Sequence, residues 1–153
     1  PVAIDLINKN YTNLSVAQIR TKDSIIYKNT LEVYKAKLLD SQQIKMMMPI
    51  VEQYFKTYVT NDYLNKILGA AYLVYNNNAT PTEINIALGW SRKAVQILEN
   101  SATLELTAKL LYRLNRKQES ITAMQSAIDK ADNPSDKNRL TLLLNAIKEN
   151  KKI

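Results

Sequence analysis

Apolar residues recur at helical spacing along most of this chain, between short polar segments that can cap helices. The clearest example begins at Thr80-Pro81-Thr82-Glu83, which combines a capping threonine, a proline at the first helical position and a glutamate three residues after the cap. This pattern predicts a helix that runs to about residue 98. Because no segment shows sustained alternation of apolar and polar residues, we predict an all-α fold without a sheet.

The same reasoning predicts further helices over about 16–39, 42–59, 62–76, 102–114, 117–131 and 135–150, with a short one over 3–9. We therefore expect about seven or eight helices in total. Asn61 or Asp62 is expected to cap the third of these, and Ser101 the fourth. Pro49 either kinks the 42–59 helix or starts a new one, because proline lacks a backbone N–H. The three methionines at 46–48 are expected to fill gaps in the core, the alternative being a Met-rich binding surface.

Composition argues against most enzyme classes. The 153 residues include no Cys and no His, which removes disulfides, Cys/His zinc sites, histidine general bases and every Ser-His-Asp or Cys-His arrangement. With only two glycines the chain has no phosphate-binding loop, and it has no clustered acidic loop for Ca²⁺. Its nearest carboxylate pairs, Glu99/Glu105 and Asp129/Asp132, are typical of solvated positions. We therefore predict no enzymatic activity, no cofactor and no metal site.

The net charge of +7 favours acidic partners, namely nucleic acid, an anionic membrane or an acidic protein. The basic residues are spread along the chain rather than gathered in a long run, so a nucleic-acid arm is not indicated. The longest apolar run, residues 68–75, is far shorter than the roughly 20 residues of a membrane span. Because the chain opens with Pro1 rather than Met, we expect it to be a processed or excised piece of a larger protein.

From residue 62 onward the predicted helices form antiparallel pairs with short connections, as in a helical solenoid. In the second pair the pattern is Leu104, Ala108, Leu111-Tyr112, Leu114-Asn115, Glu119-Ser120-Ile121, Met124 and Ala127-Ile128. In the first pair, Leu68-Gly69-x-x-Tyr72 precedes Ala87 and Ala94. The two pairs resemble tetratricopeptide repeats, with departures at Thr107, Asn115 and Ser120.

The resemblance implies a right-handed superhelix of antiparallel helix pairs. We predict a single all-α domain over 1–153, with N-terminal helices over 1–60, two tetratricopeptide-like pairs over 62–134 and a capping helix over 135–150. In such repeats small residues let helices approach closely, so Gly69, Ala87, Ala94, Ala108 and Ala127 are expected at helix contacts. Gly89 is expected to allow a close contact beside Trp90.

A narrower resemblance involves Leu64, Asn65 and Tyr72, followed after an irregular insertion by Ala87, Trp90, Ala94 and Val95. This arrangement resembles the helical region that follows the thioredoxin fold in some bacterial thioredoxin-like or thiol-disulfide interchange proteins. It implies an excised C-terminal module of such a protein and an extracytoplasmic, periplasmic location. No redox residue is carried over, because the chain has no cysteine.

The candidate site is a helix face. In a tetratricopeptide array the first helix of each pair lines a concave groove, which here would present Lys66, Glu105, Lys109, Tyr112 and Arg113. Lys109 and Arg113 are one turn apart and could jointly hold a carboxylate. Alternatively, Glu105 and Lys109 form an ordinary i,i+4 pair on a solvated helix face.

The sequence thus favours a non-catalytic helical module that binds a protein or peptide segment, for example an acidic one, or a neighbouring domain of its parent chain. The alternative function is a basic helical nucleic-acid-binding domain, which would need a contiguous basic stripe. The groove could also be closed, if residues 16–59 fold over it and fill it with Met46–Met48 and Phe55.

Overall fold

The computed structural model describes residues 41–57 and 63–153, and these residues form helices without any β-strand. Their six helices are α3 (Ser41–Thr57), α4 (Tyr63–Tyr75), α5 (Pro81–Ile97), α6 (Ser101–Arg113), α7 (Lys117–Asp129) and α8 (Pro134–Lys148). The predicted all-α class is confirmed. The helices predicted over 3–9 and 16–39, and the cap at Asn61 or Asp62, lie outside the described residues.

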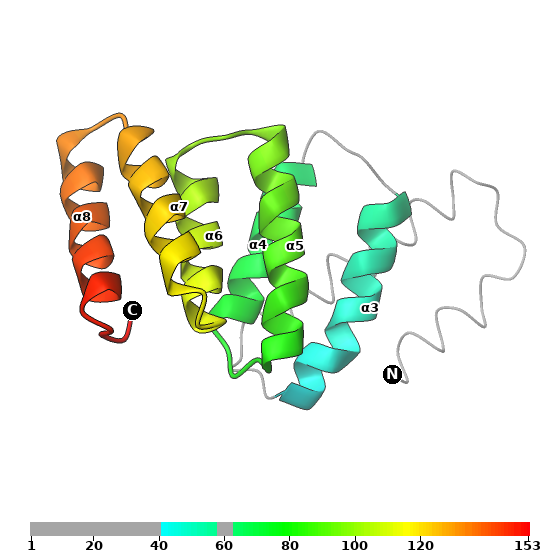
Figure 1. Cartoon of the computed structure of the whole chain (residues 1–153). Coiled ribbons are helices and arrows are strands. Elements are labelled where there is room, and N and C mark those ends of the chain that lie inside the picture. Colours follow the sequence, from blue (N-terminus) through cyan, green and yellow to red (C-terminus); the bar gives the residue numbers. More distant parts are fainter. Residues whose placement is uncertain (1–40, 58–62) are drawn as a thin grey trace, which may run out of the picture.

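The helices lie side by side in a row, and successive helices run in opposite directions from α4 to α8 (Figure 1). Each helix packs mainly on its sequence neighbours, and α4 also contacts α6. This neighbour-by-neighbour packing is consistent with a helical bundle or with stacked helix pairs. The right-handed superhelix implied by the resemblance stays a prediction.

Local capping hydrogen bonds mark where α5, α6 and α8 begin. The predicted capping box of α5 is present: the Thr80 side chain accepts from the Glu83 backbone N–H, and the Glu83 carboxylate accepts from the Thr80 N–H at 2.7 Å. In α6 the cap is one residue earlier than predicted, because Asn100 and Thr103 form their own capping box. Ser101 is therefore the first residue of the helix rather than its cap.

Asparagines in the left-handed region end α6 and α8. Asn115 has a φ of 58° and Asn150 a φ of 57°, a conformation that asparagine adopts more readily than other non-glycine residues. After α6, Arg116 N–H donates to the Leu111 carbonyl at 3.0 Å; after α8, Lys151 N–H donates to the Ala146 carbonyl at 2.8 Å. These six-to-one hydrogen bonds are those of the Schellman motif and send the chain sharply away from each helix.

Two apolar clusters fill the space between the helices. The first joins α3 to α6 and includes Ile44, Met47, Val51, Ile67, Leu88 and Leu110; the second joins α6 to α8 and includes Leu104, Met124, Leu140 and Ile147. The predicted contact alanines, Ala87, Ala94, Ala108 and Ala127, are all completely buried. Met47 and Met48 are core residues as expected, whereas Met46 is exposed.

Both glycine predictions were wrong. A Cβ atom added at Gly69 or Gly89 would meet nothing within 4 Å, so neither position needs a glycine for close helix approach. Gly89 lies on the exposed side of α5, and it is Trp90 that is buried. Pro49 lies within α3, so it does not start a new helix.

Two residues that depart from the tetratricopeptide pattern make buried hydrogen bonds between helices. The Thr107 hydroxyl on α6 lies 2.6 Å from the Ser91 hydroxyl on α5. The Ser120 hydroxyl on α7 donates to the Ala108 carbonyl on α6 at 2.8 Å. In the described residues no buried side-chain oxygen or nitrogen is left without a partner, as expected where an unpaired buried polar group would destabilise the fold.

Candidate functional site

Arg113, one of the predicted groove cations, binds the end of α4. Its guanidinium donates to carbonyl oxygens at the helix terminus and in the turn that follows, those of Val74, Tyr75, Asn77 and Ala79, with the Asn77 bond at 3.0 Å. The last carbonyls of a helix have no partner within the helix and carry partial negative charge, which favours a cation there. Arg113 therefore fastens α6 to the end of α4.

Glu105 is a buried carboxylate in an ion-pair network between α6 and α8, which corrects the interpretation of this carboxylate as solvated. Its side chain is only 6% exposed, and Arg139 binds it in a bidentate manner at 2.7 and 2.8 Å. Lys109, one turn further along α6, pairs with the same carboxylate at 2.7 Å. Burial alone raises the pKa of Glu105, but hydrogen bonds from Arg139 and Lys109, together with their charges, outweigh it and lower the pKa.

Tyr75 at the end of α4 lies against the same cations. Its ring centroid is 5.7 Å from the Lys109 ammonium and 5.9 Å from the Arg113 guanidinium, within the range of a cation–π interaction. Burial raises the pKa of the Tyr75 phenol, and Arg113 offsets only part of this effect. The phenol thus stays protonated around neutral pH and remains a hydrogen-bond donor.

The hydroxyls of two tyrosines hold the chain that follows α8. Tyr75 donates to the Ile153 carbonyl at 3.1 Å, and Tyr112 donates to the Lys151 carbonyl at 2.9 Å. The Ile153 side chain packs against the second apolar cluster. The non-helical residues 151–153, called the 151–153 segment below, therefore lie on a face built from α4, α6 and α8.

We call this surface the α4–α6–α8 face and define it by Tyr75, Glu105, Lys109, Tyr112 and Arg139. The helices α4, α6 and α8 all end at the same edge of the row, and the chain end marked C lies close to that edge (Figure 1). Lys117 strengthens the edge, because its ammonium donates to the Lys148 carbonyl at 2.7 Å and to the Asn150 side chain at 2.9 Å.

The structure gives the five predicted site residues different surroundings. Glu105, Lys109, Tyr112 and Arg113 all lie on α6 and are joined through Tyr75, Arg139 and the 151–153 segment. Lys66 precedes Tyr75 on α4 by about 2.5 turns, which places the two side chains on opposite sides of that helix. That Lys109 and Arg113 hold a partner's carboxylate stays a prediction, and both cations already have partners within the chain.

Sequence reasoning missed Tyr75, Arg139 and the 151–153 segment. Tyr75 lies at the end of the helix predicted over 62–76, where its ring is partly buried and its hydroxyl reaches the segment. No local pattern identifies Arg139 as the partner of Glu105, because that contact depends on how α8 lies against α6. Asn150 did carry a signal, since asparagine directly after a helix is typical of a sharp turn.

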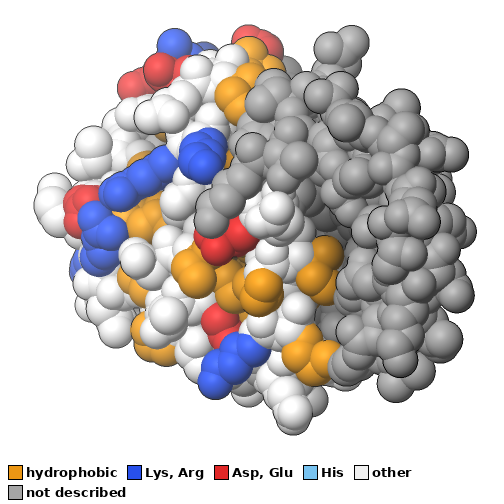
Figure 2. Space-filling view, turned by 90° about the vertical axis from the view of Figure 1, so that its right-hand side faces the viewer, with side chains coloured by type: hydrophobic (Ala, Val, Ile, Leu, Met, Phe, Trp, Pro, Cys, Tyr) orange, Lys and Arg blue, Asp and Glu red, His pale blue; other side chains and the backbone are white. Residues whose placement is uncertain are grey.

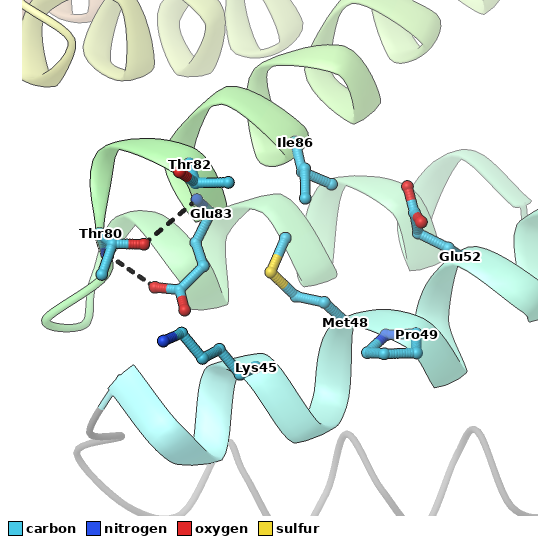
Figure 3. Close-up of a pocket in the computed structure, with 8 residues that line it drawn as sticks. All are labelled: Lys45, Met48, Pro49, Glu52, Thr80, Thr82, Glu83 and Ile86. Carbon is cyan, nitrogen blue, oxygen red and sulfur yellow. Dashed lines mark hydrogen bonds between the residues drawn. The ribbon is translucent and has the colours of Figure 1, made fainter.

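A second feature is a hollow of about 440 Å³ between α3 and the start of α5 (Figure 3). Lys45, Met48, Pro49 and Glu52 line it from α3, and Thr80, Thr82, Glu83 and Ile86 line it from α5. The Glu83 carboxylate caps the first turn of α5, and the Lys45 side chain points toward it (Figure 3). The position where an anion would approach the start of α5 is therefore taken by the chain's own carboxylate.

Charges elsewhere are mixed in sign. On the coloured part of the face in Figure 2, basic, acidic and apolar side chains are interspersed. Exposed ion pairs join Arg92 and Arg116 to Glu119, and Lys130 to Glu99. Within the described part of the chain no group of three or more acidic residues could hold a metal ion. Among the same residues no helix has both the length and the apolar character needed to cross a bilayer.

Comparison with known proteins gives no relative: no family model, no curated protein and no solved structure matches this chain.

Proposed function

We propose that this chain is a non-catalytic helical interaction module that binds a non-helical protein segment on the α4–α6–α8 face. The observation that carries the proposal is the pair of tyrosine hydroxyls, Tyr75 and Tyr112, which donate to main-chain carbonyls two residues apart. Contacts to backbone carbonyls recognise a chain in a given conformation with little dependence on its side chains. Such a site suits a peptide, whereas catalysis would require a reacting group that this face does not present.

The contacts on this face favour a partner segment that carries few charges at the place where the segment meets the two tyrosines. Lys109 is paired with Glu105, and Arg113 is bonded to the end of α4, so a carboxylate-rich partner would have to compete with contacts already made. The net charge of +7 acts at longer range, where it raises the encounter rate of an acidic protein without dictating the residues on the face. An acidic partner thus fits the proposal because long-range attraction speeds its encounter with the chain, and not because Lys109 and Arg113 bind its carboxylates.

We further propose, on the resemblance alone, that the chain belongs to a larger bacterial thioredoxin-like protein outside the cytoplasm. The support is the order of Leu64, Asn65 and Tyr72, then Trp90 between Ala87 and Ala94. In that setting the segment bound by the face would come from a partner or from another part of the parent chain.

The test is selection of random peptides on an Ile153→Asp variant, in which the chain's own 151–153 segment no longer packs on the face, followed by affinity measurement on the same variant with Tyr75→Phe and Tyr112→Phe added. Loss of two hydrogen bonds, each contributing about 0.5–1.5 kcal/mol, should weaken binding about 5-fold to 150-fold. Far-UV circular dichroism controls for folding. Failure to enrich any peptide, or equal affinity for both proteins, would contradict the proposal.

A parallel measurement with duplex DNA separates this proposal from the nucleic-acid alternative. A basic nucleic-acid-binding domain would lose affinity steeply as salt increases, and the two tyrosine substitutions would leave that loss unchanged. Tight, salt-dependent DNA binding without peptide binding would therefore favour the alternative.

A further inference from the structure

The α4–α6–α8 face already holds a segment of the chain itself. Three contacts keep the 151–153 segment there: the Tyr75 hydroxyl on the Ile153 carbonyl, the Tyr112 hydroxyl on the Lys151 carbonyl, and the Ile153 side chain against the second apolar cluster. Two of the three contacts are made to backbone. A segment from elsewhere that offers the same backbone and an aliphatic side chain could make all of them.

The chain reaches the face by a turn whose geometry is fixed locally. Asn150 adopts a φ of 57°, the Lys151 N–H closes the six-to-one bond to Ala146, and Lys117 holds the Asn150 side chain from α7. The turn orients the segment toward Tyr112 and Tyr75. The side chains of Lys151 and Lys152 are exposed, while Ile153 is partly buried.

We propose that the 151–153 segment is a latch that occupies the face in cis and is displaced by the partner. The partner is then a non-helical segment with an aliphatic side chain at the place of Ile153, preceded two residues earlier by a carbonyl for Tyr112. This inference rests on the proposed function, because both concern the α4–α6–α8 face. It adds that the 151–153 segment competes for the face, and it states the chemistry of the partner segment.

The contacts suit a reversible latch. Two hydrogen bonds and one partly buried isoleucine hold the segment only because it is tethered, and a short tether provides an effective concentration in the millimolar range. A partner that makes the same contacts and further ones along α4 and α6 can outcompete it. If the face is free for about one tenth of the time, the apparent affinity for a partner is reduced about tenfold.

The test compares variants of the 153-residue chain that differ only in the segment. Ile153→Asp places a charge against the apolar cluster and should release the latch, whereas Ile153→Leu keeps an aliphatic side chain and Lys152→Asp changes an exposed neighbour. The probe is a synthetic peptide of residues 149–153, titrated at millimolar concentration and followed through the amide resonances of α4 and α6. Heteronuclear relaxation of residues 151–153 reports directly whether the segment is released.

We expect the peptide to bind the Ile153→Asp protein about tenfold more tightly than the unchanged chain, with Ile153→Leu and Lys152→Asp close to the unchanged chain. Adding Tyr75→Phe and Tyr112→Phe to Ile153→Asp should abolish this gain. Equal affinity for the Ile153→Asp and unchanged proteins would overturn the latch, as would a peptide that shifts no resonance of α4 or α6. Should Ile153→Asp lower helicity, Ile153→Ser provides the same comparison without a charge. If selected peptides still bind the unchanged chain through the two tyrosines, the proposed function survives the loss of the latch.

Discussion

The buried hydroxyl pair between α5 and α6 gives the sharpest test of how this fold is held together. Ser91 is completely buried, and its hydroxyl lies 2.6 Å from that of Thr107, which in turn donates to the Thr103 carbonyl at 2.9 Å. Thr107→Val preserves the shape of the side chain but leaves the Ser91 hydroxyl without this partner. A buried hydroxyl left unpaired costs about 1–3 kcal/mol, so the free energy of unfolding should fall by that amount.

The converse substitution should be milder. Ser91→Ala leaves the Thr107 hydroxyl bonded to Thr103, so we expect a loss of about 1 kcal/mol. With both changes together no polar group is left unpaired, and stability should return close to that of the unchanged protein. The double variant should therefore be more stable than Thr107→Val alone, with a coupling energy of about 1 kcal/mol or more.

The assay is urea unfolding followed by far-UV circular dichroism, with thermal melting as a second measure. At this chain length a loss of 1 kcal/mol corresponds to a shift of about 2–4 °C in Tm. The matched control is Thr141→Val, where an exposed threonine makes the same bond to the carbonyl four residues earlier, at 2.7 Å to Lys137. It should change stability by less than about 0.5 kcal/mol. If Thr107→Val behaved like this control, or if the two single losses simply added, the reasoning would be refuted.

Three further outcomes follow. Gly89→Ala should raise stability by about 0.5–1 kcal/mol, because a Cβ there meets nothing within 4 Å; a fall in Tm would reveal a contact. Ala127→Leu should cost about 1–3 kcal/mol by overpacking a completely buried site, and an unchanged Tm would contradict the packing. Because Arg139 and Lys109 overcome burial and lower the pKa of Glu105, its stabilisation is present above its ordinary value of 4.5 and lost as pH falls below it. Glu105→Gln should lose that part of the acid dependence in pH-resolved urea unfolding.

Helix identity was predictable because its causes are local. The Thr80–Glu83 capping box and the Ala87 and Ala94 spacing involve residues within a few turns of each other, so the sequence alone indicates them. The error at Ser101 also has a local cause. Asn100 is the better cap because its backbone N–H donates to the Thr103 hydroxyl at 3.2 Å. The roles of the glycines were harder to predict, because whether Gly89 allows a close helix contact depends on which atoms of other helices lie opposite it.

The candidate face could be predicted only in part. The i,i+4 spacing of Glu105 and Lys109 predicted their ion pair, and helical periodicity placed Tyr112 near them. The second cation on Glu105 comes from α8, 34 residues further along the chain. No spacing rule reaches across such a distance, which is why the carboxylate was interpreted as solvated.

Within residues 41–57 and 63–153 the sequence by itself determined the helices, most of their ends and the buried alanines between them, all consequences of capping, periodicity and side-chain size within one or two turns. Only the tertiary structure decided what the polar side chains do. The arrangement of α4, α6 and α8 with their ends at one edge gave Arg113 the end of α4 to bind, gave Glu105 a second cation, and turned two tyrosine hydroxyls toward the 151–153 segment. These roles depend on where distant helices end relative to one another, and that placement is set by contacts between residues far apart in the sequence.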